Sequence, residues 1–284
     1  MKVLVTGING QLGHDVMAEL EKRHIECIGA GRQQFDITDC EAVREFITTV
    51  QPDAVIHCSA YTAVDKAESN AEACYQANAV GPENIAKVCK AIDAKMVYIS
   101  TDYVFPGTGE QFYKVDDSTG PTNVYGKTKL AGEQAVQKLL TKYFIVRISW
   151  VFGKNGNNFV KTMLRLGKEK EKLTVVADQV GSPTYTADLA PLLCDMVATD
   201  KYGVYHATNE GVCSWAEFAA EIMQQAGLGC KIVPIPTREY PTPATRPLNS
   251  RMSKDKLVKC GFKRLPTWQD ALSRYLKELD GAEK

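Results

Sequence analysis

The sequence predicts an α/β protein with a Rossmann-type, doubly wound parallel sheet and a smaller C-terminal α/β domain. Residues 1–13 read MKVLVTGINGQLG, a short apolar run followed by closely spaced glycines. Apolar, β-branched segments then alternate with segments of helical periodicity, which is typical of a parallel sheet covered on both faces. After residue 150 this alternation becomes less regular, which indicates a second, smaller unit.

The elements follow in chain order. Strands are expected where apolar and β-branched residues dominate, at 3–5, 27–29, 54–58, 96–99 and 145–148. Helices are expected where apolar residues recur every three or four positions, at 11–22, 42–50, 73–92 and 130–140. Beyond residue 150 we expect short strands near 173–176 and 204–206, and helices near 188–198 and 215–226. Five prolines between 234 and 247 exclude a helix there and favour an extended loop.

A glycine turn connects the first strand to the first helix. Gly7, Gly10 and Gly13 follow the spacing GxxGxxG, which differs from the GxGxxG of many dehydrogenases. Without Cβ atoms, such a turn lets a pyrophosphate approach the backbone amides and the helix N-terminus. Residues 1–150 are therefore predicted to bind NAD(P), with about 186–206 returning to this domain, and 151–185 and 207–284 are predicted to bind substrate.

The composition excludes several classes of protein. The 34 Lys and Arg residues balance the 34 Asp and Glu residues at a pI near 6.9, so no basic footprint for nucleic acid is present. No apolar run reaches the roughly eighteen residues that span a membrane, and we expect no signal peptide. Nine cysteines without a CxxC pair are typical of reduced thiols in the cytoplasm. The four histidines lack metal-ligand spacing, so no metal is expected.

Tyr125 and Lys129 lie four residues apart in the segment NVYGKTKLAGEQ. On a helix this spacing places both side chains on one face, with Cβ atoms roughly 6 Å apart. A nearby ammonium stabilises an ionised phenol, so we expect Lys129 to lower the pKa of Tyr125 toward the working range. The phenol then exchanges a proton with a carbonyl. The same spacing occurs on ordinary amphipathic helices, but the glycine turn favours the catalytic interpretation.

Polar or aromatic residues follow three of the predicted strands. In an open parallel sheet the ligand crevice lies at the carboxyl ends of the strands. We therefore expect these residues to meet around one cofactor. They are Ser59, Ala60, Tyr61 and Thr62 after the third strand, Ser100, Thr101 and Asp102 after the fourth, and Trp150 after the fifth.

Several motifs together name a family. They are GINGQLG at 7–13, FDITD at 35–39, SAYTAVDKAE at 59–68, STDYVFPG at 100–107, YGKTKLAGE at 125–133, SWVFG at 149–153, NNFVKTML at 157–164 and TPATRPLNSRM at 242–252. The chain closely resembles the dTDP-4-dehydrorhamnose reductases of the extended short-chain dehydrogenase/reductase superfamily. The resemblance implies NAD(P)H-dependent reduction of the C4 ketone of dTDP-4-dehydro-β-L-rhamnose to dTDP-β-L-rhamnose, which supplies bacterial surface polysaccharides.

The resemblance also assigns roles around the ketone. Tyr125 is expected to donate the proton, Lys129 to tune it and hold the nicotinamide ribose, and Thr101 to hydrogen-bond the C4 carbonyl. Asp102 and Trp150 match positions that contact the substrate. Two alternatives stay open, because threonine after a strand also caps turns and Trp150 suits a core position as well.

On the cofactor side, the resemblance places Gly10, Gln11 and Leu12 at the pyrophosphate and Asp36 and Ile37 at the adenine. Tyr61 and Thr62 are expected to line the path of the cofactor. A role of Asp36 in capping the following helix explains that residue equally well.

The end of the second strand favours NADPH over NADH. NAD-selective sites carry an acidic residue there, whereas this chain reads Ala30, Gly31, Arg32. A guanidinium can bind a 2′-phosphate in a bidentate manner, so we expect Arg32 to select NADPH. An exposed loop arginine with no such role is the alternative.

On the substrate side, Arg246 in TRPLNSR is the first candidate for the diphosphate of the dTDP-sugar, and Arg251 is the second. Exposed arginines often contribute little. A homodimer is compatible with the sequence, and a metal bridge through Asp15 or Asp188 fits only loosely.

Other functions remain open at this level. One alternative is a reductase or epimerase that acts on another 4-keto nucleotide sugar. An epimerase would retain NAD⁺. Thr101 is followed by Asp102 and Tyr103 rather than the Asp-Glu pair typical of dehydratases, which argues against dehydration. A third hypothesis is a non-catalytic regulatory subunit resembling that of methionine adenosyltransferase, because fold alone does not specify function.

Overall fold

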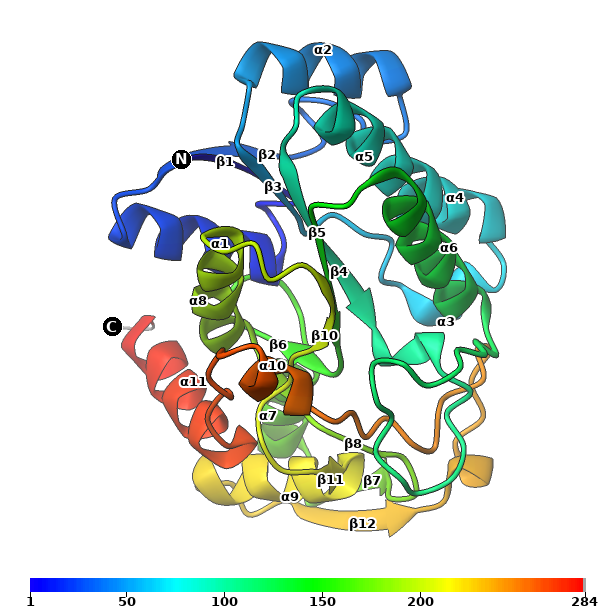
Figure 1. Cartoon of the computed structure of the whole chain (residues 1–284). Coiled ribbons are helices and arrows are strands. Elements are labelled where there is room, and N and C mark those ends of the chain that lie inside the picture. The colour runs from blue at the N-terminus through cyan, green and yellow to red at the C-terminus, as the bar shows by residue number, and fades with distance from the viewer. Residues whose placement is uncertain (283–284) are drawn as a thin grey trace.

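A six-stranded parallel sheet forms the centre of the protein in the computed structural model, which describes residues 1–282 (Figure 1). The strand order is β10-β5-β4-β3-β1-β2, and the predicted fold class is confirmed. The strands are β1 Lys2–Thr6, β2 Glu26–Ala30, β3 Ala54–His57, β4 Lys95–Thr101, β5 Tyr143–Ile148 and β10 Gly203–His206. Because the chain turns from β2 back across β1 to β3, the carboxyl ends of β1 and β3 mark the switch point where ligands bind.

Helices cover both faces of this sheet (Figure 1). Val3 and Val5 point to the face covered by α1 Gln11–Lys22 and α8 Thr186–Val197, whereas Leu4 points to the other face. That second face carries α2 Cys40–Val50, α5 Gly81–Ala91 and α6 Val124–Leu139. The alternation follows from the period of two along a strand, and burial on both sides explains why the strands are apolar throughout.

The expected helix at 73–92 is interrupted in the structure. Its place is taken by α4 Ala71–Tyr75, a π-helical turn η1 Gln76–Val80, and α5. In this turn the Asn78 side chain binds the backbone of Tyr61 through both polar atoms, accepting from its N–H at 2.8 Å and donating to its C=O at 3.0 Å. Such turns are frequent at functional sites. Here the turn aims Asn78 at the loop after β3, which also holds the short helix α3 Val64–Ala67.

A second hydrophobic core forms beyond residue 150. It packs α7 Phe159–Glu169, α9 Trp215–Gln225 and α11 Trp268–Ala282 against β7 Lys172–Val176 and β12 Lys231–Ile235. The remaining elements are β6 Val151–Phe152 paired with β9 Thr184–Tyr185, β8 Val180–Gly181 paired with β11 Cys213–Ser214, the helix α10 Asp255–Lys259, and the 3₁₀ turns η2 Asp102–Val104 and η3 Thr237–Glu239. The domain boundaries expected at 150, 185 and 206 stay a prediction.

The proline-rich segment differs in part from expectation. Pro234 lies inside β12, and η3 follows Pro236. A proline is tolerated there because β12 has a neighbour on one side only, in a two-stranded ladder with β7. The periodicity of the sequence did not predict the helices α7 and α11. The last two residues of the predicted substrate-binding segment, 283–284, lie outside the described residues. None of the described helices is long and apolar enough to cross a membrane.

Candidate active site

The glycine turn after β1 is too tight for larger residues. Gly7 has a φ of 73°, and a Cβ atom there would lie 2.8 Å from the Ser59 amide nitrogen. A Cβ atom at Gly13 would overlap the carbonyl oxygen of Gly7. Gly10 caps α1 without any side-chain hydrogen bond, so the first amides of α1 are open to a ligand. This cradle fits the pyrophosphate of a dinucleotide.

A cavity of about 380 Å³ lies beside this turn, at the carboxyl ends of β1, β2 and β3. Thr62 and Leu12 are not among the residues that line it. Six of the residues expected to bind the cofactor are brought together here: Arg32, Asp36, Ile37, Ser59, Ala60 and Tyr61.

Asp36 and Arg32 stand at the outer part of this cavity. Asp36 Oδ1 accepts hydrogen bonds from the amide and hydroxyl of Thr38 at 2.9 and 2.8 Å, and these bonds lower the pKa of Asp36. The helix α2 is capped by Asp39 instead, so a helix-capping role for Asp36 is wrong. Arg32 is 89% exposed and lies 3.5 Å from Asp36, which leaves its guanidinium free to turn toward a ligand.

Tyr125 lies in the first turn of α6, which Asn123 caps by accepting from the Gly126 amide at 2.8 Å. Burial raises the pKa of Tyr125 above its ordinary value, the negative charge of Asp102 adds to this, and a hydrogen bond with Thr101 opposes it. The expected lowering of this pKa is therefore wrong. The phenol stays protonated through the neutral range, as a proton donor requires.

Lys129 packs on an aromatic residue of the neighbouring strand β4. Its Nζ atom lies 4.1 Å from the centre of the Tyr98 ring, and the side chain is almost fully buried. Burial lowers the pKa of Lys129 to about 7, against the opposing charge of Glu133. Glu133 is itself fixed by Arg147, at 2.9 and 2.7 Å. The Glu133 carboxylate of this buried pair lies one helical turn beyond Lys129, and its charge favours the charged form of Lys129.

Thr101 ends β4 and is bonded to its neighbour. Its hydroxyl donates to Asp102 Oδ1 at 2.9 Å and accepts from the Tyr103 amide at 3.2 Å, so Thr101 does cap η2. Ser250 Oγ donates to the other oxygen of Asp102. Burial raises the pKa of Asp102 to about 6, while the bonds from Ser250 and Thr101 act to lower it.

Trp150 adopts a left-handed backbone conformation with a φ of 51°. For a tryptophan this conformation costs on the order of 1 kcal/mol or more, and such residues cluster at functional sites. Its ring stacks on Trp215 with centroids 3.8 Å apart and an interplanar angle of 15°. Trp150 is partly buried at the margin of the second core, so it combines packing with an accessible edge.

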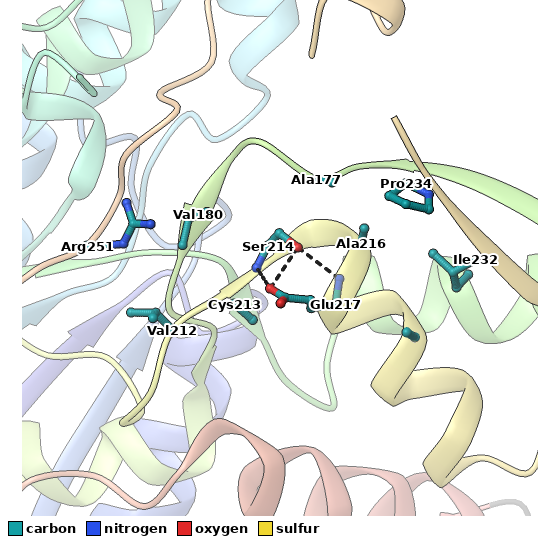
Figure 2. A pocket seen from close by; sticks show the side chains of 11 residues that line it. Ala177, Val180, Val212, Cys213, Ser214, Ala216, Glu217, Ile232, Pro234 and Arg251 are labelled. Carbon is teal, nitrogen blue, oxygen red and sulfur yellow. Dashed lines mark hydrogen bonds between the residues drawn. The ribbon is translucent and has the colours of Figure 1, made fainter. Parts of the chain in front are cut away.

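The two candidate arginines differ in their surroundings. Arg246 is bound to Asp65 at 2.5 Å and donates to the Tyr103 hydroxyl at 3.0 Å, so its charge is already balanced. Arg251 lines a cavity of about 630 Å³, shown in Figure 2 together with Ser214 and Pro234. Arg251 is therefore the arginine better placed for an anion in that cavity.

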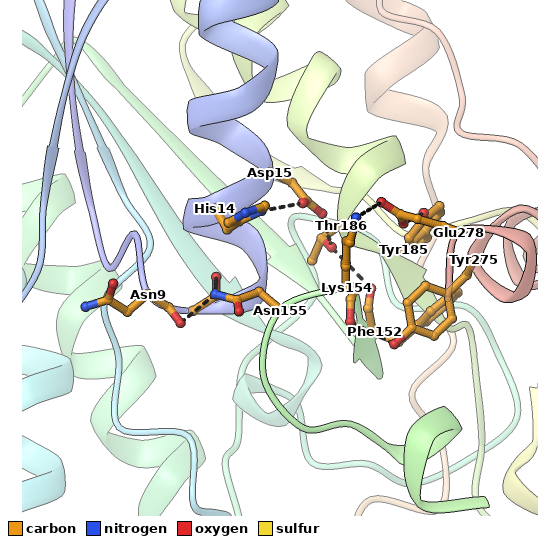
Figure 3. Close-up of polar contacts among 12 residues, drawn as sticks. Asn9, His14, Asp15, Phe152, Lys154, Asn155, Tyr185, Thr186, Tyr275 and Glu278 are labelled. Atoms are coloured by element: carbon orange, nitrogen blue, oxygen red, sulfur yellow. Dashed lines mark hydrogen bonds and ion pairs between the residues drawn. The ribbon is translucent and has the colours of Figure 1, made fainter. Parts of the chain in front are cut away.

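The loop between β6 and α7 lies against the glycine turn. Asn155 Nδ2 donates to the carbonyl oxygen of Asn9 at 2.9 Å (Figure 3), and Asn158 Nδ2 lies 3.0 Å from Gln11 Oε1. One turn further along α1, Thr186 donates to Asp15 at 2.5 Å. The side chain of Gln11, which is expected at the pyrophosphate, is thus hydrogen-bonded by Asn158 of the C-terminal half. Among residues 1–282, no group of three or more His, Cys, Asp or Glu side chains could hold a metal ion.

Several residues around the site could not be singled out from the sequence. Tyr98 sits inside an apolar strand, Glu133 on an ordinary helix, and Ser250 in a proline-rich loop, and none has a spacing signal of its own. Asn78 could have been noticed as a polar residue inside a helical pattern. The motifs STDYVFPG and RPLNSRM did mark the two segments that contain Asp102 and Ser250, and these two residues are hydrogen-bonded in the structure.

Comparison with known proteins agrees with this geometry. The model of the RmlD substrate binding domain matches residues 1–280. The spore coat polysaccharide biosynthesis protein SpsK of Bacillus subtilis is 41% identical over 281 residues, covering 99% of both chains. The dTDP-4-dehydrorhamnose reductase of Escherichia coli is 39% identical, covering 98% of both chains.

A solved structure extends the comparison to the fold. The dTDP-4-dehydrorhamnose reductase of Bacillus anthracis, in complex with NADP, superposes with a TM-score of 0.95 at 44% identity and covers 98% of this chain and 99% of its own. The chain therefore belongs to the family of dTDP-4-dehydrorhamnose reductases.

Proposed function

We propose that this protein is an NADPH-dependent oxidoreductase that reduces the C4 ketone of dTDP-4-dehydro-β-L-rhamnose to the alcohol of dTDP-β-L-rhamnose. The observation that carries this proposal is a protonated phenol, Tyr125, hydrogen-bonded to Thr101 at the carboxyl end of β4. Family membership over residues 1–280 supports the same reaction. The name of the Bacillus subtilis relative supports a place in polysaccharide biosynthesis.

The residues of the site divide the chemistry among them. When bound, NADPH supplies a hydride to the C4 carbon of the sugar. Tyr125 then gives its proton to the C4 oxygen, which has received the electron pair of the broken carbonyl π bond. Lys129, in its charged form, stabilises the tyrosinate that this leaves behind and binds the nicotinamide ribose.

NADPH rather than NADH is the preferred cofactor in this proposal. The lining of the 380 Å³ cavity contains Arg32, and no acidic residue ends β2. The Bacillus anthracis relative was solved in complex with NADP. Asp36 and Ile37 line the adenine end, while Gly7, Gly10 and the start of α1 hold the pyrophosphate.

The substrate is placed between this site and the C-terminal core. Trp150 and Asp102 lie at the edge of the space for the sugar. The diphosphate is bound by Arg251, or by Arg246 once Arg246 is released from Asp65. The nine free cysteines support a cytoplasmic location. A homodimer stays a prediction.

The decisive experiment measures NADPH oxidation by loss of its near-ultraviolet absorbance with freshly prepared dTDP-4-dehydrorhamnose, and identifies the product sugar by chromatography. We expect oxidation by the wild type and a loss of at least a hundredfold in Tyr125→Phe, the lower end of what general acid catalysis contributes. Tyr143→Phe, at the opposite end of the sheet, is the matched control and should stay active.

Other outcomes point to other functions. Turnover by Tyr125→Phe at the wild-type rate would remove Tyr125 as the acid. A protein that retains NAD⁺ through purification and interconverts C4 epimers without consuming NADPH would be an epimerase. If the folded protein binds the cofactor but turns over no 4-keto nucleotide sugar, the regulatory role is the hypothesis that remains.

A further inference from the structure

The hydroxyl group of Thr101 has only one hydrogen, and in the structure that hydrogen is already used. Thr101 Oγ1 donates to Asp102 Oδ1 at 2.9 Å and accepts from the Tyr103 amide at 3.2 Å. It is also hydrogen-bonded to Tyr125, where the neutral phenol is the donor because the hydrogen of Thr101 goes to Asp102. A ketone oxygen is an acceptor only. Thr101 therefore cannot donate to a sugar ketone for as long as it donates to Asp102.

Charge creates a second conflict at the same place. As the ketone is reduced, negative charge builds on the C4 oxygen, and groups around it must stabilise that charge. An ionised Asp102, bonded directly to Thr101, repels it. The influence of this carboxylate already reaches the reacting phenol, because its charge contributes to the raised pKa of Tyr125. Both conflicts disappear when Asp102 carries a proton.

Ser250 determines where that proton sits. Its hydroxyl donates to Asp102 Oδ2, so Oδ2 is occupied as an acceptor. Oδ1 accepts from Thr101 in the structure, so a neutral carboxyl group needs one of the two bonds to reverse. If Ser250 keeps donating to Oδ2, the hydrogen is placed on Oδ1 and the bond to Thr101 is the one that reverses. Thr101, Asp102 and Ser250 are 5%, 3% and 2% exposed, so water does not compete for these bonds.

The surroundings of Asp102 make its protonation easier than that of an exposed aspartate. Burial is the largest influence and raises its pKa to about 6. The titratable groups that face it are two phenols, Tyr103 on η2 and Tyr125 on α6, while the segment 246–252 contributes the hydroxyl of Ser250. The nearby cation, Arg246, is bonded to Asp65 and to the Tyr103 hydroxyl instead.

We propose that Asp102 acts in the reduction as a neutral hydrogen-bond donor: Asp102 Oδ1–H donates to Thr101, Thr101 donates to the ketone, and Ser250 is the positioning residue that keeps the proton on Oδ1. This proposal rests on the proposed function. The proton of Asp102 is not consumed. The hydride adds to C4, the carbonyl electron pair moves to oxygen, and Tyr125 supplies the proton of the product hydroxyl.

Asp102→Asn is the first test, because an amide Nδ2 can donate to Thr101 while its Oδ1 accepts from Ser250. The pH profile of kcat/KM reports the groups of the free enzyme. We expect the wild-type value to fall as pH rises through the pKa of Asp102, and this alkaline limb to be absent from Asp102→Asn. An unchanged limb, or no turnover at any pH in a folded variant that binds NADPH, would overturn the proposal.

Ser250→Ala tests the positioning role. Loss of a donor to the carboxylate disfavours ionisation, so we expect the same limb to move to higher pH while the plateau falls severalfold. An equal loss at every pH, with no movement of the limb, would show that Ser250 only packs. Ser253→Ala is the control, because that hydroxyl accepts only the Asp255 amide, at 3.3 Å.

Two other titrations must be separated from that of Asp102. The 2′-phosphate of NADPH titrates near pH 6, as phosphate monoesters do (second pKa about 6), so the profiles are repeated with NADH, which lacks it. A limb that belongs to Lys129 persists in Asp102→Asn.

A spectroscopic measurement decides the point without turnover. With aspartate labelled at its carboxyl carbon, the resonance absent from Asp102→Asn should titrate near pH 6 in the wild type. A midpoint at the ordinary value of 3.8 would overturn the proposal even in an active enzyme. If the wild type oxidises no NADPH, the proposed function fails, and this titration still shows separately whether Asp102 holds a proton near neutrality.

Discussion

The ammonium group of Lys129 lies over the ring of Tyr98, 4.1 Å from its centre. The Tyr98 hydroxyl is bonded to the carbonyl oxygen of Asn78 at 2.9 Å, so the ring is held in place by the π-helical turn. The strand β4 therefore supplies the surface on which the lysine of α6 is positioned.

This contact predicts the pH dependence of cofactor binding. A ring face stabilises an ammonium by roughly 1–2 kcal/mol in a desolvated site, so its loss should lower the pKa of Lys129, now about 7, still further. We expect NADPH affinity to weaken above pH 7 in the wild type, and in Tyr98→Leu to weaken from roughly one pH unit lower. Tyr98→Phe keeps the ring and should follow the wild type. Titration of NADPH fluorescence measures both, and identical curves for Tyr98→Leu and wild type would refute the role of the ring.

Arg32 predicts the choice between the two nicotinamide cofactors. Its exposed guanidinium lines the adenosine cavity and has Asp36 as a weak partner at 3.5 Å. Arg32→Ala should raise KM for NADPH about tenfold or more, as expected for a lost charge-assisted pair worth about 1.5–3 kcal/mol, and leave KM for NADH almost unchanged. Arg238→Ala, in η3 away from the cavity, is the control. The same NADPH to NADH preference in Arg32→Ala would mean that selectivity comes from elsewhere.

A side chain at Gly7 should weaken cofactor binding through steric crowding, and a control glycine separates this effect from backbone strain. Gly7→Ala places a Cβ atom 2.8 Å from the Ser59 amide at a φ of 73°, so both the backbone and the neighbouring strand must shift. We expect NADPH affinity to fall more than tenfold. Gly227→Ala has a comparable φ of 64° with nothing within 4 Å, so it should lose about 1 kcal/mol of stability and keep its cofactor affinity. Equal cofactor affinities in the two variants would contradict the tight cradle.

Two buried histidines predict how stability depends on pH. Burial lowers the pKa values of His57 and His206 from 6.5 to about 3, so each is neutral in the folded protein. Between these values the unfolded chain binds more protons, and the free energy of unfolding falls as pH decreases from about 6.5 toward 3. Asp102, with a pKa raised from 3.8 to about 6, acts in the opposite direction and offsets some of this slope. Urea unfolding from pH 7 to 4 should therefore show declining stability. The decline should be smaller in His57→Gln, and an equal decline would exclude His57 as a cause.

The sheet and the cofactor cradle were predictable because they depend on local pattern. An apolar run, three glycines and an amphipathic helix specify a strand, a turn and a helix wherever they occur in this order. Tyr125, Thr101 and Arg32 were likewise singled out as candidates from their positions relative to such elements, and their roles stay predictions. The direction of the Tyr125 pKa was not predictable, because it depends on burial by segments far away in the chain.

The same limit explains the other differences. The π-helical turn at Asn78 exists because that side chain binds Tyr61 in another loop, and periodicity along one segment cannot show such a contact. Arg246 looked available as an isolated cation, but its partner Asp65 is 181 residues away in sequence. Pro234 could enter a strand because β12 has a neighbour on one side only.

The stacked indoles of Trp150 and Trp215 are an intrinsic spectroscopic probe of the conformation of this protein. One ring follows the fifth strand of the sheet and the other begins α9, and both rings pack against the second hydrophobic core. Any shift of α9 against the segment that follows β5 must slide or separate these rings, whose centroids lie 3.8 Å apart. Exciton coupling between such chromophores depends steeply on their separation and angle. The near-ultraviolet circular dichroism of the unlabelled protein thus reports how α9 sits against the end of β5, with no added probe.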